Sequence, residues 1–167
     1  MKVAAKTAVI LIGIAAIILF FNCFVQHKRS IILTDYDILE LSAALESYKN
    51  DHGHYPTDPG TTEQLRPNAT YDPAAYEAAA AYLYRALFVS DDKNQGSYLP
   101  DFGTNRLRTD TKKGVTRFID PWGNYYGYST FKSVHPDSPD GNNSSFDLWS
   151  TAGNKKQVDQ SKWAKNW

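Results

Sequence analysis

The chain has 167 residues, and an apolar N-terminal segment of about 30 leaves enough for one domain with a modest core. Lys plus Arg and Asp plus Glu number 18 each, so no net charge favours nucleic acid or a polyanionic substrate. The chain has a single cysteine, Cys23, which excludes an intramolecular disulfide.

The first element is an uncharged apolar run of 18 residues, Ala8–Val25. As a helix it would be ~27 Å long, close to the hydrocarbon thickness of a bilayer, so it predicts a membrane span with Cys23 as a buried thiol. Basic residues lie on both sides of the run, and we expect the amino terminus inside. An uncleaved anchor is favoured over a removed secretory signal, because no small-x-small cleavage site follows.

An amphipathic segment, Thr34–Asn50, continues this run without a proline or glycine between them. Its apolar stripe has helical spacing: Thr34, Ile38, Leu41, Leu45 and Tyr48. We place Asp37, Glu40 and Lys49 on the other, polar face. The pattern predicts one rod from about Ala4 to Asn50, closed by a left-handed Gly53.

A second helix is predicted to begin at Asp72-Pro73, with the aspartate as cap and the proline in the first turn. Its apolar stripe is Tyr76, Ala80, Leu83 and Leu87. The alanines at 78–81 allow a close approach to the first helix.

The remaining chain alternates between polar loops and short strand patterns. Residues 91–114 are polar and predict a long surface loop or a partner contact. Strands are expected at 115–119, 125–131 and 145–150, the first two forming a hairpin through the turn Asp120-Pro121-Trp122-Gly123. Three antiparallel strands after two helices indicate an α+β domain. Trp163 and Trp167 in the polar tail are expected to fold back onto the sheet.

Three blocks carry a resemblance to a known family: residues 48–56 (YKNDHGHYP), 120–128 (DPWGNYYGY) and 146–150 (FDLWS). Behind a membrane-spanning helix, they resemble the major pseudopilin of bacterial type II secretion and related type IV pilin-like proteins. The resemblance implies a pilin-like α+β fold, in which a long membrane-spanning helix precedes a second helix and a small three-stranded antiparallel sheet. It divides the chain into a membrane anchor with the start of the long helix, 1–33, and a pilin-like soluble domain, 34–167.

The implied function is structural. Such a subunit is a single-pass protein of the bacterial inner membrane, with its C-terminal domain in the periplasm, and it builds a short filament for protein export. Its partners would be copies of itself or other pseudopilin-like subunits, met through the N-terminal helix, and the inner-membrane secretion machinery. No nucleic-acid partner is expected.

The sequence departs from the family at the amino terminus. The family has a Gly-Phe processing point and a glutamate soon after it, whereas Gly13 here precedes Ile14 and no acid occurs before Asp35. An alternative is therefore a monomeric, membrane-tethered periplasmic binding module, whose loops 91–114 and 135–143 hold a ligand or a protein.

The family's acidic calcium loop corresponds to residues 150–156. Ser150, Asn154 and Asp159 offer three side-chain oxygens for calcium. Lys155 and Lys156 add positive charge beside them, so we expect binding to be weak or absent. Calcium is the only cofactor that the sequence suggests.

Two further chemistries are not favoured. His52 and His54 stand two residues apart without a nearby third ligand, which is typical of a helix exit rather than a zinc site. The sequence also has no G-x-S-x-G motif, no P-loop and no dinucleotide-binding glycine pattern, so we do not expect an enzyme.

Overall fold

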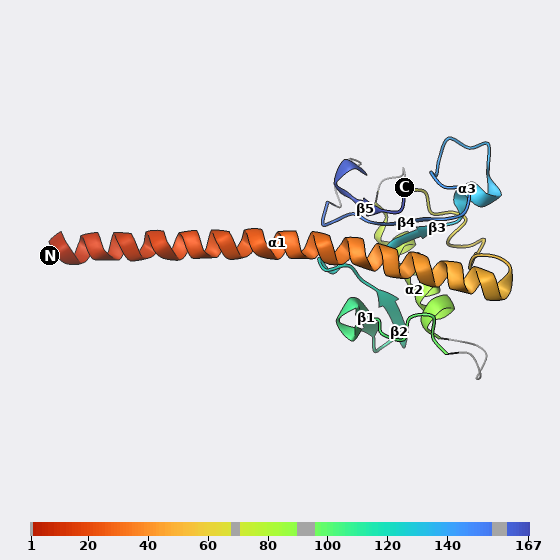
Figure 1. Cartoon of the computed structure of the whole chain (residues 1–167), viewed down its shortest axis with the longest axis horizontal. Coiled ribbons are helices and arrows are strands. Elements are labelled where there is room, and N and C mark those ends of the chain that lie inside the picture. Colours follow the sequence, from red (N-terminus) through yellow and green to blue (C-terminus); the bar gives the residue numbers. More distant parts are fainter. Residues whose placement is uncertain (1, 68–70, 90–95, 155–159) are drawn as a thin grey trace.

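The protein was analysed as a computed structural model, which describes residues 2–67, 71–89, 96–154 and 160–167, with side chains from residue 11 onward. Its dominant element is the helix α1, Lys2–His52, an unbroken rod of 51 residues and ~76 Å. The remaining elements gather around the C-terminal half of α1, and the N-terminal half projects alone (Figure 1). The predicted single rod is confirmed.

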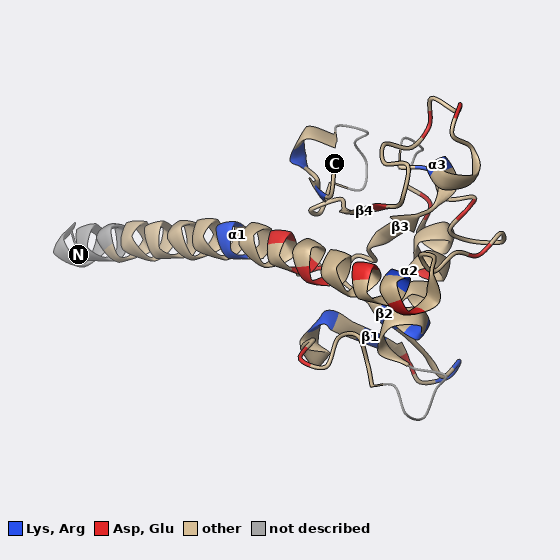
Figure 2. Cartoon of the chain, turned by 45° about the vertical axis from the view of Figure 1, so that its right-hand side comes forward, with Lys and Arg blue, Asp and Glu red and all other residues tan. Residues whose placement is uncertain are grey.

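The projecting half of α1 is a candidate transmembrane helix by its length and composition. Its described side chains, from residue 11 onward, are exposed and mostly apolar, and along this described part Figure 2 shows no charged residue before a first basic band next to the domain. Cys23 is exposed on this half of the isolated chain, and the burial of its thiol inside a bilayer stays a prediction. No described part of the domain reaches that level of the helix.

The other half of α1 is embedded in the domain. Thr34, Ile38, Leu41 and Leu45 of the predicted stripe are buried. The helix ends where Gly53, at a φ of 79°, donates its N–H to the carbonyl of Lys49 at 2.7 Å, as predicted.

The helix α2, Pro73–Phe88, begins as predicted. The carboxylate of Asp72 accepts the N–H of Ala74 at 2.9 Å, which caps the first turn. The four residues of the predicted stripe are buried. The helix packs against α1 and against two strands, β2 (Val115–Phe118) and β3 (Gly127–Ser129).

The strands form two antiparallel sheets. One pairs β1, Leu107–Asp110, with β2, Val115–Phe118. The other has the order β3-β4-β5, from Gly127–Ser129, Asp147–Ser150 and Ala164–Lys165. Three single-turn helices complete the described elements: η1, Thr104–Arg106; α3, Phe131–Val134; and η2, Gln160–Lys162. The α+β class with small antiparallel sheets is confirmed.

The strand pairing differs from the prediction. The expected hairpin between 115–119 and 125–131 is reduced to one bridge, Ile119 to Tyr125, because β2 pairs with β1 and β3 pairs with β4. The sequence predicts a loop over 91–114, and β1 lies within that range. Within the segment 125–131 only Gly127–Ser129 forms a strand, and the last residue, Phe131, begins α3.

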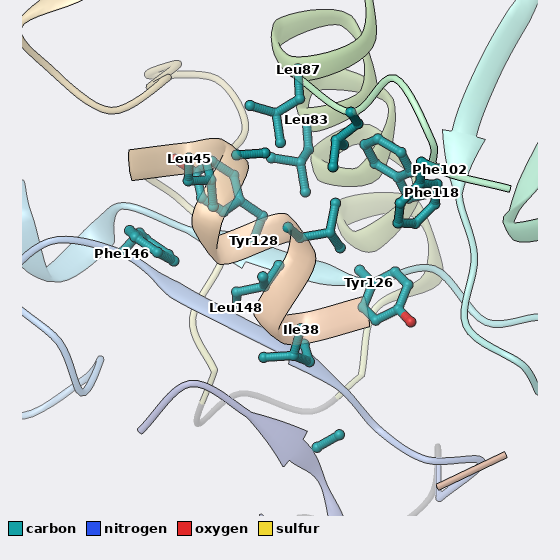
Figure 3. Close-up of a cluster of buried hydrophobic side chains, with 14 residues drawn as sticks. Ile38, Leu45, Leu83, Leu87, Phe102, Phe118, Tyr126, Tyr128, Phe146 and Leu148 are labelled. Atoms are coloured by element: carbon teal, nitrogen blue, oxygen red, sulfur yellow. The ribbon is translucent and has the colours of Figure 1, made fainter. Parts of the chain in front are cut away.

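Two apolar clusters hold the domain together. In the larger one, Ile38 and Leu45 of α1 meet Leu83 and Leu87 of α2, and Leu148 of β4 lies among them (Figure 3). In the smaller one, the rings of Trp149 and Trp163 stack at a centroid distance of 6.3 Å. The Nε1–H of Trp149 donates to the hydroxyl of Tyr76 at 2.7 Å. The predicted return of the C-terminal tail to the sheet is confirmed.

Candidate functional site

The candidate site lies where α1 leaves the domain. The ring of His27 meets the ring of Trp122 edge-on, with 6.1 Å between their centroids. His27 follows the last residue of the uncharged run, Val25, by only ~3 Å along the helix axis. The edge of the domain therefore stands directly beside the end of the candidate membrane span.

A buried ion pair attaches the domain to the rod. Arg106, in η1, donates through Nη1 to Asp37 Oδ1 at 2.6 Å and to Glu40 Oε2 at 2.7 Å. Tyr126 donates its hydroxyl hydrogen to Asp37 Oδ2 at 2.8 Å. The Asp37 side chain has an exposed fraction of 0%, so our placement of Asp37 on the polar face is wrong. Its charge is accommodated because two donors from distant segments, Arg106 and Tyr126, converge on it.

The environment of Asp37 alters its acidity. Burial raises the pKa of Asp37 to about 6, although the hydrogen bond from Tyr126 and the charge of Arg106 act in the opposite direction. Burial, together with the charge of Asp37, raises the pKa of the Tyr126 hydroxyl, which remains protonated and donates. At neutral pH the carboxylate is therefore mostly ionised and held by two different parts of the domain.

The turn Asp120–Gly123 forms as predicted and lies beside α1. Gly123 donates its N–H to the carbonyl of Asp120 at 2.8 Å and has a φ of 77°. Asp120 Oδ1 accepts the backbone N–H groups of Trp122 at 3.0 Å and Asn124 at 2.8 Å. These bonds fix the position at which Trp122 faces His27.

The three residues predicted for calcium do not share one surface loop. Ser150 lies in β4 and is fully buried; its hydroxyl donates to Asp120 Oδ2 at 2.7 Å and accepts the N–H of Ala152 at 3.0 Å. Asn154 closes the next turn by donating its N–H to the carbonyl of Thr151 at 2.8 Å. Asp159 lies outside the described residues. Calcium at this loop stays a prediction.

His52 and His54 lie at the exposed end of α1. The ring of His52 stacks on that of Tyr48 with a centroid distance of 4.1 Å, and its Nε2 is 3.2 Å from the hydroxyl of Tyr98. Among the described residues, no group of three or more His, Cys, Asp or Glu side chains is placed to hold a metal ion.

Two cavities flank α1 at its exit from the domain. One, of about 350 Å³, lies between α1, the Trp122 turn and the C-terminal tail. The other, of about 480 Å³, lies on the opposite flank between α1, η1 and the same turn, with Arg29, Asp37 and Arg106 in its wall. Sequence reasoning missed both cavities, because each is assembled from segments far apart in the chain.

For one of the missed residues, Asp37, the burial could have been predicted from the sequence. Asp37 stands three residues after Thr34 and four before Leu41, so the helical spacing already places it on the buried face. Arg106 had no comparable signal, because it follows a polar segment and meets its partners only through the tertiary fold.

Comparisons with protein-family models, with curated proteins and with solved structures gave no match for this chain. Its function is therefore inferred from its own residues.

Proposed function

We propose that the chain is a single-pass, membrane-anchored structural subunit that assembles through α1 into a short pseudopilin-like filament. In this proposal α1 is anchored in a bacterial inner membrane, the domain lies in the periplasm, and the assembly serves protein export. One observation carries the proposal: an apolar stripe on the embedded half of α1 that the domain leaves uncovered. This outer stripe consists of Ile32, Tyr36 and Leu39, with exposed fractions of 68%, 58% and 69%.

The outer stripe lies opposite the core face of α1. At ~100° per residue, Ile32, Tyr36 and Leu39 point ~180° away from the face that carries Leu41 and Leu45. A helix with an apolar stripe on two opposite faces is suited to a partner on each of them. The domain occupies one face, and the other is open.

A second copy of the chain fits the open face best. The outer stripe continues the exposed apolar surface of the candidate membrane span, so its partner has to follow α1 from the bilayer into the domain region. The α1 helix of a second copy has the required length, and it carries the same apolar span followed by the same outer stripe. Two such helices would pack ~8–10 Å apart, with the domains turned outward.

The resemblance of the three sequence blocks to pseudopilins supports the same assembly. The missing Gly-Phe point at Gly13-Ile14 and the absence of an acid before Asp35 weigh against the family's processing and its charge pairing. The proposed contact does not depend on either feature, because it uses the apolar outer stripe alone.

Photo-crosslinking in membranes tests the proposal. The full chain carries benzoylphenylalanine in place of Tyr36, and a matched variant carries it in place of Thr111, an exposed residue of the β1–β2 turn. We expect a ladder at multiples of the chain mass from position 36 and none from position 111. Leu39→Asp should remove the ladder without unfolding the chain, because Leu39 is exposed.

The absence of multimers from position 36 would overturn the assembly proposal. The mass of the chain isolated from membranes adds a second measurement: loss of an N-terminal segment with N-methylation would establish processing of the pseudopilin kind. An intact, monomeric chain would instead favour the tethered binding module, which the cavities beside α1 suit.

A further inference from the structure

We propose that the cavity between α1, the Trp122 turn and the C-terminal tail binds a phospholipid headgroup that carries a primary amine. We call it the His27 cavity, after the residue at its membrane-proximal side. The inference rests on the membrane anchoring in the proposed function, and it does not depend on filament assembly.

The position of the His27 cavity along α1 brings it to headgroup level. His27 lies ~3 Å beyond Val25, the end of the uncharged run, and Asp35 lies ~15 Å beyond it. The polar layer of a bilayer extends ~5–8 Å beyond the hydrocarbon on each side. The membrane-proximal end of the cavity, at His27, therefore lies in the headgroup layer, whereas the backbone of Asp35 lies ~7–10 Å beyond the layer and is reached by a headgroup that extends outward from it.

The wall of the cavity carries one acidic and one basic residue, which can pair with the two opposite charges of a zwitterionic headgroup. Asp35 lines the cavity on the helix side, and Lys162 and Asn154 line it on the tail side. A headgroup phosphate would pair with Lys162, and the amine would donate to Asp35. The face of Trp122 attracts a cation, and indole rings are suited to the membrane interface.

The tail wall is held in place before any ligand binds. Ala152 has a φ of 49° and Gly153 a φ of 82°, and their turn is closed by the bond from the Asn154 N–H to Thr151. Positive φ at a non-glycine residue is unfavourable and persists where the surroundings impose it. Trp122 packs over this turn, so close that a Cβ added to Gly153 would lie 3.4 Å from Trp122 Cδ1.

The size and the aromatic wall also suit a small ligand. A volume of about 350 Å³ lies within the usual range for ligand pockets, ~300–1,000 Å³. Trp163 forms part of the wall with an exposed fraction of 8%, and its indole Nε1 has no hydrogen-bond partner among the described residues. The cavity on the opposite flank offers less, because Asp37 and Arg106 there already neutralise each other.

Lipid binding to the full chain in detergent micelles tests the inference. The chain is titrated with dioleoyl phosphatidylethanolamine, phosphatidylcholine or phosphatidylglycerol, and bound lipid is counted by native mass spectrometry. We expect phosphatidylethanolamine to bind about tenfold more tightly than the other two. Asp35→Asn should abolish that preference, and Lys162→Gln should weaken binding of all three lipids.

Matched substitutions control for surface charge. Asp101→Asn and Lys112→Gln change exposed charges away from the cavity and should leave lipid binding unchanged. Asp35 and Lys162 are also exposed, so their variants should keep the wild-type thermal midpoint. Soluble glycerophosphoethanolamine should not displace the bound lipid at equal concentration, because it lacks the acyl chains that lie along the anchor.

Equal affinity for the three lipids, or an unchanged preference in Asp35→Asn, would overturn the inference. Displacement by the soluble headgroup at equal concentration would also overturn it, because the ligand would then be a free phosphoamine. Alkaline carbonate extraction of membranes tests the anchoring of α1 independently of lipid preference. A chain that stays in the membrane pellet without lipid preference refutes the headgroup site alone.

Discussion

Arg106 donates to Asp37 at 2.6 Å and so joins two positions that are 69 residues apart in the chain. The aspartate is fully buried and the arginine side chain has an exposed fraction of 22%. We expect Arg106→Gln to lower the free energy of unfolding by about 3 kcal/mol, because it leaves a buried carboxyl without its cation. Urea unfolding of the fragment 34–167, which keeps the buried residues of the described domain, measures the change.

Arg85→Gln is the matched control for this substitution. Arg85 is exposed on α2 and its replacement should change the free energy of unfolding by less than about 0.5 kcal/mol. Similar losses in the two variants would show that the Arg106 contact contributes nothing specific.

The pH dependence of stability should reveal the burial of Asp37. Its folded pKa of about 6 lies above the reference value of 3.8, so the folded chain binds this proton more tightly than the unfolded chain. The stabilisation of the folded chain by this bound proton is fully present below about pH 4 and is lost as the pH rises through 6. Between pH 4 and 7.5, the wild type should lose on the order of 3 kcal/mol more than Asp37→Asn.

Urea titrations of both proteins across that pH range provide the measurement. Burial also raises the pKa of Asp120 and of Asp147, and these residues contribute equally in the two proteins. A difference that stays constant with pH, or that grows in the other direction, contradicts the assignment.

Gly123 is expected to be structural. Its φ of 77° is unfavourable for a β-branched residue, and a Cβ there would lie 2.9 Å from Arg108 Nη2. Gly123→Val should therefore cost about 2 kcal/mol and lower the thermal midpoint. Gly96→Val is the control, since a Cβ at Gly96 meets no atom within 4 Å. An unchanged midpoint in Gly123→Val would refute the prediction.

The fragment 34–167 should be monomeric at micromolar concentration. It lacks the candidate membrane span and Ile32, and it keeps only Tyr36 and Leu39 of the outer stripe. Two side chains bury too little area for a stable interface, which usually needs ~1,200 Å² or more. Sedimentation velocity measures the mass, and a stable dimer of the fragment would count against assembly through the anchoring helices.

Calcium should have little effect on stability. Lys155 and Lys156 adjoin the predicted loop, and the Ser150 hydroxyl already serves Asp120 and Ala152. A bound ion would add ~2.7 kcal/mol at a hundredfold excess over its dissociation constant. Thermal unfolding in millimolar calcium and in EDTA should give the same midpoint; a rise abolished by Asp159→Ala would restore the family's site.

Features that depend on neighbouring residues could be predicted from the sequence. The cap at Asp72, the helix end at Gly53 and the turn at Asp120 each follow from one residue's own backbone or side-chain preference, and all three form. The rod also follows directly, because an apolar run and an amphipathic helix succeed each other without a breaker.

Strand pairing and the candidate site could not be predicted in the same way. The sequence predicts a loop at β1 because these residues lack an alternating apolar pattern. In the structure Arg108 and Thr109, next to each other in the strand, are both exposed. β1 pairs with β2, and β3 pairs with β4. This pairing depends on tertiary contacts of the whole domain and not on neighbouring residues. The junction at Asp37 and the His27 cavity likewise arise from segments that only the fold brings together.

Because α1 is one continuous helix, a change in the direction of its N-terminal half also moves its C-terminal half. About 40 Å of the helix lies beyond Val25, and the domain is fastened to that part, in part through Arg106. A tilt of ~20°, ordinary for a membrane helix, would carry the far end at His52 sideways by roughly 14 Å. If α1 is anchored as proposed, a bilayer that changes the tilt by changing its thickness would therefore reposition the whole domain without any hinge.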